Sequence, residues 1–366
     1  MLTISNTIYP EQFDRLEAII AAFQNGNTSQ AESLMDAMTR RQPEIASLPE
    51  RLQTQLFLDA LYSRLKQTAE TENLYLIPDE GQQIRMFNFM AEKFPVVRYA
   101  QEIANTIFLN QVAEDERFVI LDVGIGTGQQ ISSLIERLTE QNAPVKQITV
   151  LGVEPSAESL GKAELRFQQL AQAHGIRIAF TGIQKTVEQL NPEDWALLRR
   201  EIQDTGGKLL INASFAMHHV QPPPFRTEFF RQLKALDPAV FMMLEPYADY
   251  TPDNLMERFK NAWHHYGLTF LAIDTIDDTS DSEKSAVKQV FFGREMMDVL
   301  GAGNRVEQFE TAEMWLHRLV QGGFMPNRIS HTVPGGFNPL VQIKQAGSYV
   351  GFNVMGHPIV SVICAS

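Results

Sequence analysis

Cysteine is almost absent from this 366-residue sequence, since Cys364 is the only one. A single thiol excludes an intrachain disulfide and a zinc site built from several cysteines. The sequence also lacks any apolar run approaching the roughly 20 residues that a membrane span requires. Its N-terminus has neither the basic start nor the apolar stretch of a signal peptide. We therefore expect a cytoplasmic protein that does not enter a membrane.

Basic residues are scarce relative to acidic ones. The 31 lysines and arginines stand against 44 aspartates and glutamates, which gives a formal net charge of −13. A protein that neutralises many phosphates usually presents a basic surface, because counterion release drives that binding. The charge therefore argues against a nucleic-acid partner without excluding one. The hydrophobic share of 44% and the charged share of 20% are those of a globular protein.

Two kinds of pattern follow one another along the chain. In the first part, apolar residues recur at helical spacing, as in PEQFDRLEAIIAAFQ (10–24), and prolines separate the stretches. From Arg117 onward, short apolar runs alternate with helical stretches. The runs are RFVILDV, QITVLGVE, IRIAFTG, KLLINAS and AVFMMLEP. This alternation predicts a parallel sheet covered on both faces. We therefore divide the chain into a helical cap, 1–110, and an α/β domain, 111–366.

The C-terminal segment SYVGFNVMGHPIVSVICAS has a different pattern. It predicts two strands joined by a turn near Gly356. Such a hairpin would close the sheet with an antiparallel edge.

The stretch LDVGIGTGQQ carries the clearest functional signal. Gly124, Gly126 and Gly128 follow an apolar strand and precede a helix, so the backbone there can approach a ligand closely. The spacing differs from the dinucleotide fingerprint Gly-x-Gly-x-x-Gly, and Asp122 would repel a pyrophosphate. A carboxylate there suits a ligand with a cationic end and no phosphates, such as S-adenosylmethionine. Glu154, after the second strand, is placed to bind the ribose hydroxyls. The alternative, a plain tight turn with a surface glutamate, is less favoured.

Weaker signals follow the third and fourth strands. Gln184 could contact the edge of an adenine, although a plain loop explains it equally well. Asn212, Ser214, His218 and His219 lie at the carboxyl end of the fourth strand, where open α/β sheets bind their ligands.

Methyl transfer to an oxygen or nitrogen requires alignment of donor and acceptor and removal of a proton. His218 and His219 are candidate bases, because an imidazole titrates near neutral pH. Glu245 lies at the end of the neighbouring strand. We expect one histidine to face the crevice and the other to pack against the cap. A purely structural, hydrogen-bonded role is equally well supported.

Two other groups of residues have structural interpretations. His264 and His265 lie on a predicted helix without a further ligand at i+3 or i+4, so we expect packing and no metal site. A group of charged residues could recognise a charged substrate or form internal salt bridges, and we favour salt bridges. These residues are Arg294, Glu295, Arg305 and Glu307.

Several motifs together resemble the GRAS-domain family. MFNFMAEKFPVVRYAQEIANTIFL is similar to the family's helix pair before the first strand, and FVILDVGIGTGQQ to its strand-and-glycine motif. LLINASFAMHHV is similar to its fourth-strand motif. The most specific match is FFGREMMDVLGAGNRVEQFETAEMWLHRLVQGGFMP. YVGFNVMGHPIVSVICAS resembles the terminal strand pair but lacks the tryptophan that usually ends it.

The resemblance implies a Rossmann-like class I methyltransferase fold. It would contain a mostly parallel seven-stranded sheet, a C-terminal antiparallel hairpin and an N-terminal helical cap. Plant members are transcriptional regulators that act through protein partners and sometimes DNA, and their glycine motif is typically eroded. This sequence keeps Asp-x-Gly-x-Gly-x-Gly, so it looks like the bacterial branch, which has been proposed to modify or bind small molecules.

We therefore predict an S-adenosylmethionine-dependent methyltransferase that acts on a small organic molecule. The alternatives are a small-molecule-binding regulator without turnover and a protein- or DNA-interaction protein. The expected partners are a small methyl acceptor and, as an open alternative, a second copy of the chain. The predicted cofactor-binding residues are Asp122, Gly124, Gly126, Gly128, Glu154, Gln184, Asn212 and Ser214, and the predicted catalytic residues are His218, His219 and Glu245.

Overall fold

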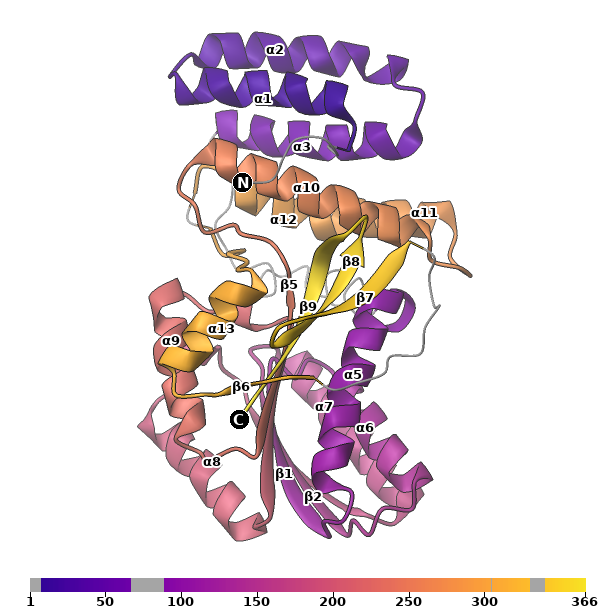
Figure 1. Cartoon of the computed structure of the whole chain (residues 1–366), viewed down its shortest axis with the longest axis vertical. Coiled ribbons are helices and arrows are strands. Elements are labelled where there is room, and N and C mark those ends of the chain that lie inside the picture. The colour runs from indigo at the N-terminus through magenta and orange to yellow at the C-terminus, as the bar shows by residue number, and fades with distance from the viewer. Residues whose placement is uncertain (1–7, 67–88, 304, 330–339) are drawn as a thin grey trace.

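The computed structural model describes residues 8–66, 89–303, 305–329 and 340–366 (Figure 1). These residues contain a nine-stranded sheet in the order β3-β2-β1-β4-β5-β9-β8-β7, with β6 paired to β9. Strand pairs from β3 to β5 are parallel, and pairs from β5 to β7 are antiparallel. The strands are β1 Arg117–Val123, β2 Gln147–Val153, β3 Arg177–Ile183, β4 Lys208–Ser214, β5 Val240–Pro246, β6 Pro326–Asn327, β7 Val341–Ala346, β8 Tyr349–Val354 and β9 His357–Ala365.

The sheet confirms the α/β class, the parallel strands and the C-terminal hairpin. Each of the five apolar runs forms one of the strands β1–β5, and β8 and β9 pair antiparallel across Gly356. The expectation of seven strands is wrong, because β6 and β7 extend the sheet to nine. Neither has a continuously apolar sequence: β6 is two residues long, and most of β7 is not buried. Their pairing with neighbouring strands, rather than local composition, makes them strands.

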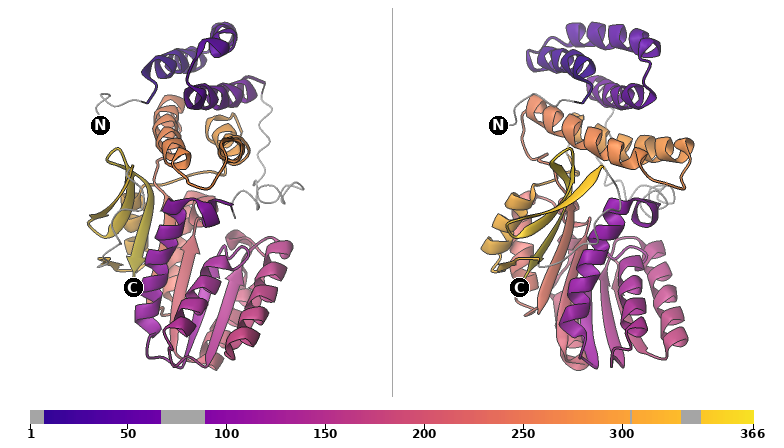
Figure 2. Two further views of the ribbon diagram at one scale, coloured as in Figure 1. Left: turned by 90° about the vertical axis from the view of Figure 1, so that its right-hand side faces the viewer. Right: turned by 45° about the vertical axis from the view of Figure 1, so that its right-hand side comes forward.

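Helices cover both faces of the sheet (Figure 2). Alternate residues of β1 point to opposite faces: Phe118 and Ile120 join one apolar core, and Val119 and Leu121 join the other. The first core also contains residues of α5, α6 and α7, and the second contains residues of α8, α9 and α13. These helices are α5 Pro95–Val112, α6 Gln129–Glu140, α7 Ala157–His174, α8 Pro192–Thr205, α9 Pro223–Lys234 and α13 Ala312–Gln321.

A layer of helices lies beyond one end of the sheet (Figure 1). It comprises α1 Pro10–Gln24, α2 Thr28–Arg41, α3 Leu48–Lys66, α10 Leu255–Asp274, α11 Asp281–Ala286, the π-helix η4 Val287–Phe292 and α12 Gly293–Leu300. Trp263 joins the N-terminal helices to α10. Its Nε1 donates a hydrogen bond to the Ile8 carbonyl at 2.7 Å, and its carbonyl accepts one from Gln53 at 3.3 Å. The ring of Phe57 packs edge-on against it, with centroids 4.9 Å apart.

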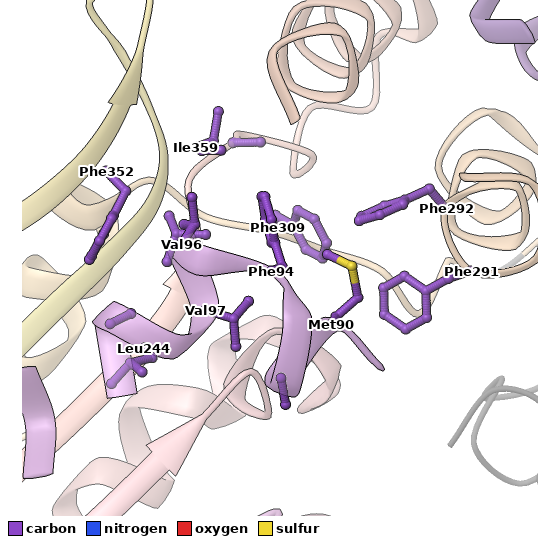
Figure 3. Packing of buried hydrophobic residues seen from close by; sticks show 14 of the residues in the cluster. Met90, Phe94, Val96, Val97, Leu244, Phe291, Phe292, Phe309, Phe352 and Ile359 are labelled. Atoms are coloured by element: carbon purple, nitrogen blue, oxygen red, sulfur yellow. The ribbon is translucent and has the colours of Figure 1, made fainter. Parts of the chain in front are cut away.

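Aromatic side chains fill the junction between the helical layer and the sheet. Figure 3 shows Phe94, at the start of α5, lying near Phe309, with Met90, Phe291 and Phe292 on the side of the helical layer. All five are buried. Because this contact is apolar and continuous, the layer and the sheet share one core.

The division of the chain at residue 110 stays a prediction. In the fold, α5 packs on the sheet beside α6, although most of its residues precede that boundary. The helical layer also takes α10, α11 and α12 from the second half of the chain. Met86 to Asn88, at the start of the first motif, lie outside the described residues. No helix among the described residues is long and apolar enough to cross a membrane.

Candidate functional site

The turn from β1 into α6 has the backbone that its glycines predict. Gly124, Gly126 and Gly128 have φ angles of +75°, +52° and +72°, a region that other residues rarely adopt. A Cβ on Gly124 would lie 2.6 Å from the Cβ of Ala216, and one on Gly128 would lie 2.8 Å from the Phe167 ring. A Cβ on Gly126 would meet nothing within 4 Å. Two of these glycines therefore allow close packing, and Gly126 leaves open space.

A cavity of about 170 Å³ opens beside this turn, at the carboxyl ends of the parallel strands. This is the place where open α/β sheets bind ligands. The predicted residues that line it are Asp122, Gly124, Gly126, Glu154, Asn212, Ser214 and His219. Gly128, Gln184, His218 and Glu245 are not among the lining residues.

Asp122 is buried at the end of β1. Its Oδ1 accepts a hydrogen bond from Nδ2 of Asn212 at 2.8 Å. Burial raises the pKa of Asp122 to about 7; the Asn212 hydrogen bond opposes this shift, and the charge of Glu154 adds to it. Gln130 continues the polar network: its Nε2 donates to Asn212 at 3.1 Å, and its Oε1 accepts from Ser214 at 2.6 Å.

Gln130 and Asn105 were not predicted as site residues. The Asn105 amide donates to the Gln130 carbonyl at 3.2 Å, and both residues are buried. The sequence signal for Asn105 was a polar residue on the apolar face of the helix α5. Nothing in the local sequence connects this residue to the glycine turn. The network makes the floor of the cavity polar although the surrounding core is apolar.

Glu154 turns back onto the glycine turn. Its Oε2 accepts a hydrogen bond from the Gly126 N–H at 3.1 Å, and its Oε1 accepts one from the Ser156 N–H at 3.0 Å. Each carboxylate oxygen has a second lone pair. Glu154 therefore supports the turn and keeps the capacity to accept hydrogen bonds from a ligand.

The loop after β3 contributes different residues from the one predicted. Gln184 is exposed and does not line the cavity, whereas Lys185, Thr186 and Glu188 do. The Lys185 ammonium lies 2.6 Å from the carboxylate of Asp194. Residues that follow Gln184 therefore line the cavity, and Gln184 itself does not. The sequence places this loop beside the site but does not show which of its residues face the ligand space.

The histidine pair lies in the 3₁₀ turn η3 Met217–His219, and its two side chains line different cavities. His219 lines the cavity, and His218 faces the apolar junction. Nδ1 of His218 lies 2.5 Å from Oε2 of Glu245, whose Oε1 accepts hydrogen bonds from the N–H groups of Met217 and Ala216 at 2.8 and 3.1 Å. Burial raises the pKa of Glu245 to about 8 and lowers the pKa of His218 well below its usual value.

Glu307 also reaches this turn. One of its oxygens lies 3.5 Å from Nε2 of His218, and the other lies 3.5 Å from Nδ1 of His219. Glu307 is therefore part of the histidine cluster, whereas an internal salt bridge had been expected for it. Arg305 donates to the Tyr250 carbonyl and forms an ion pair with Asp253, whose carboxylate lies 3.7 Å from its guanidinium.

Arg226 of α9 ties the histidine turn to the segment before α13. Its guanidinium is fully buried and donates to the carbonyls of His218 and Gln308 at 2.6 and 2.9 Å. It also donates to Glu310 at 2.7 Å and lies 4.9 Å from the Trp315 ring centroid. Sequence reasoning missed this arginine, because its partners come from distant segments.

The fold and the cavity define an α/β protein with a crevice at the carboxyl ends of its parallel strands. The model of the GRAS domain family matches residues 13–354. The chain therefore belongs to the GRAS domain family, and the resemblance seen in its motifs is confirmed.

Several curated relatives are plant proteins. The chain is 26% identical to "DELLA protein RGL3" of Arabidopsis thaliana over 252 residues, which cover 67% of the chain and 47% of the relative. It is 21% identical to "Scarecrow-like transcription factor PAT1" of the same plant over 269 residues, 70% of the chain and 54% of the relative. The chain thus spans about half the length of the curated relatives it matches.

A solved structure has a similar fold. The crystal structure of SCL7 from Oryza sativa superposes with a TM-score of 0.77 at 17% identity, covering 97% of this chain and 99% of that chain. At this identity the likeness establishes the fold alone.

The predicted function is corrected by these comparisons. The relatives are DELLA and Scarecrow-like proteins, one of them named a transcription factor, so the prediction of a methyltransferase acting on a small organic molecule is wrong. The prediction that the protein's role is to bind a small molecule is wrong for the same reason. The alternative, a transcription-regulator-like protein, fits the relatives better. The glycine turn misled the prediction because it belongs to the fold, and one fold supports many functions.

Proposed function

We propose that this protein is a regulator of the GRAS type that acts by binding a macromolecular partner. The observation that carries the proposal is the family match over residues 13–354, together with the regulatory names of the relatives. We also propose that the fold is the class I methyltransferase variant of the Rossmann fold, which the order β3-β2-β1-β4-β5 followed by an antiparallel edge supports.

The chemistry of the site supports a non-enzymatic role. A general base must come within hydrogen-bond reach of the proton that it removes. Of the three residues predicted to be catalytic, His219 alone lines the cavity. Glu245 is fully buried, and its carboxylate accepts hydrogen bonds from backbone N–H groups of the loop after β4. That carboxylate stabilises the loop conformation.

The net charge of −13 favours a protein partner with a basic surface over a nucleic acid. A second copy of the chain is an alternative partner. Electrostatic attraction to a basic protein predicts faster association at low salt than at high salt.

The test is purification of the tagged chain from its own cells after crosslinking, followed by identification of what is bound and by reconstitution from pure components. We expect a stoichiometric complex with a protein, whose association rate falls as the salt concentration rises. Light scattering on the purified chain separates a homodimer from a complex with another protein. A methylated small molecule, formed by the purified wild-type protein and not by Asp122→Ala, would contradict the proposal.

We further propose that the cavity holds S-adenosylmethionine as a bound ligand. The residues fit the group: Gly126 leaves space beside the turn, Glu154 can accept hydrogen bonds from ribose hydroxyls, and Asp122 can attract a cationic end. Gly124, Asn212 and Ser214 line the same space. In this proposal these residues hold S-adenosylmethionine as a ligand, and no methyl transfer is assigned to them.

Calorimetric titration with S-adenosylmethionine and S-adenosylhomocysteine tests this second proposal. We expect binding to the wild type and loss of binding in Asp122→Ala. Absence of heat at millimolar ligand, with folded protein, would refute it without affecting the proposed regulatory role.

A further inference from the structure

Three ligand-type side chains meet at the edge of the crevice. They are His218 and His219 of η3 and Glu307 of the segment before α13. One ligand atom from each lies within 4.8 Å of the others. The two histidine rings have centroids 3.9 Å apart and are inclined by 51° to each other, so their nitrogens can point to a common position.

The distances in this cluster suit a tetrahedral metal ion. Zinc binds histidine nitrogens and carboxylate oxygens at about 2.0–2.2 Å, so two ligand atoms of a tetrahedral site lie about 3.4 Å apart. The carboxylate oxygens of Glu307 lie 3.5 Å from Nε2 of His218 and 3.5 Å from Nδ1 of His219. These separations are long for hydrogen bonds and close to the edge of such a tetrahedron.

The neighbours of His218 fix its ring in the way that is common for a histidine that binds a metal ion. Its Nδ1 lies 2.5 Å from Oε2 of Glu245, which leaves Nε2 directed toward Glu307. A carboxylate on the outer nitrogen of a ligating histidine fixes the ring orientation and the tautomer. Phe309 packs edge-on against the same ring, with centroids 4.7 Å apart, and shields it from water.

The buried negative charge of Glu307 is a second, independent reason to expect a metal ion here. Glu307 is 1% exposed, and among the described residues its Oε2 accepts no hydrogen bond. A buried carboxylate is costly unless it is paired or coordinates a metal. The nearby cation of Arg226 is already paired with Glu310, at 2.7 Å.

We propose that His218, His219 and Glu307 bind a divalent transition-metal ion, with zinc as the best match, and that Glu245 orients His218 from behind. Imidazole ligands favour zinc over magnesium or calcium, which prefer oxygen alone. Three protein ligands leave a fourth position open, and His219 places the site at the edge of the crevice. The ion would join the loop after β4 to the segment before α13.

This proposal departs from the expectation of no metal site. The sequence places the two histidines together but leaves the third ligand in a remote segment, and only the fold brings it near. The other adjacent histidines, His264 and His265, lie on α10. Their cluster contains His357, whose ring centroid is 4.6 Å from that of His264. It therefore offers a matched control in the same protein.

The test uses the full chain, stripped with a chelator and then titrated with Zn²⁺ alone by calorimetry, with Co²⁺ as a spectroscopic substitute. We expect one ion per chain and the strong visible absorption of tetrahedral cobalt. Glu307→Gln and His219→Gln should each weaken Zn²⁺ binding at least 100-fold, and Glu245→Gln should weaken it about 10- to 100-fold. His264→Gln should bind as the wild type does.

Circular dichroism of each variant checks that it folds. If Glu307→Gln fails to fold, the Zn²⁺ affinity of His219→Gln tests the proposal. The His219 side chain is partly exposed at the crevice, so its replacement should disturb the fold less. Failure of the folded wild type to bind Zn²⁺ at millimolar concentration would overturn the proposal. So would unchanged affinity in a folded Glu307→Gln or His219→Gln variant. The outcome is independent of whether a regulatory partner is found.

Discussion

Replacing Asp122 with asparagine should make the protein more stable at neutral pH and leave its stability unchanged in acid. The substitution keeps the shape of the side chain and the oxygen that accepts the hydrogen bond from Asn212, which measures 2.8 Å in the wild type. It removes only the ability to ionise. The effect on the free energy of unfolding therefore reports what it costs to hold a carboxylate at this buried position.

The magnitude follows from the pKa. Burial raises the pKa of Asp122 from 3.8 to about 7, a shift of about 3 units. Each unit corresponds to about 1.4 kcal/mol, so the full effect is about 4 kcal/mol. Below about pH 3 the carboxyl is protonated in both the folded and the unfolded chain and the cost is absent. As the pH rises toward 7, the unfolded chain ionises first, so the wild type loses stability over that range.

Urea unfolding, followed by circular dichroism from pH 4 to pH 8, measures the difference between Asp122→Asn and the wild type. We expect a difference of about 0.6 kcal/mol at pH 4 that grows to about 4 kcal/mol by pH 7 and then levels off. Asp14→Asn, an exposed aspartate of α1, controls for the removal of one negative charge. A difference that does not change with pH would refute the reasoning, because it would mean that Asp122 ionises as easily in the fold as in water.

Three further predictions use the same unfolding and titration measurements. Glu154→Ala should weaken S-adenosylmethionine binding with little loss of stability, and unchanged affinity in the folded variant would remove Glu154 from the site. Arg226→Met should lower the free energy of unfolding by about 3–5 kcal/mol, because it breaks a buried ion pair with Glu310 and leaves the buried carbonyls of His218 and Gln308 without this donor, although Glu310 keeps its pair with Arg318; a loss below about 1 kcal/mol would show that the ion pair is dispensable. Gly124→Ala should destabilise more than Gly126→Ala, since both have positive φ but only the first adds a contact, at 2.6 Å to Ala216. The second change should cost about 1–2 kcal/mol, the strain of a left-handed residue, and equal losses in the two variants would argue against the contact.

Local sequence determined the elements at the centre of the fold. Apolar, β-branched runs specified β1, β2, β4 and β5, because a strand that is buried on both faces is apolar at most positions. The run at Arg177–Ile183 also forms a strand, β3, although this edge strand is buried only at Ile183. The turn at Gly356 and the apolar residues beside it specified the β8–β9 hairpin. The three glycines after Asp122 specified a turn with positive φ. Each of these features depends on residues that are neighbours in the chain, so the sequence alone predicts it.

Tertiary structure decided what the local pattern leaves open. β6 and β7 are strands because β9 and β8 pair with them, although their own sequences are weakly apolar. Gln184 does not line the cavity, whereas Glu307 joins the histidine cluster, and no spacing in the sequence distinguishes these cases.

Neither the glycine turn nor the fold indicates the function, because the same fold occurs in regulators and in enzymes. The sequence by itself determined the family, through ordered motifs that are read residue by residue. Only the structure decided which groups meet across the sheet: Asp122 with Asn212, Arg226 with Glu310, and the histidines with Glu307. The physical reason is that hydrogen bonds and ion pairs act over a few ångströms, and the folded chain brings residues from distant segments within that range.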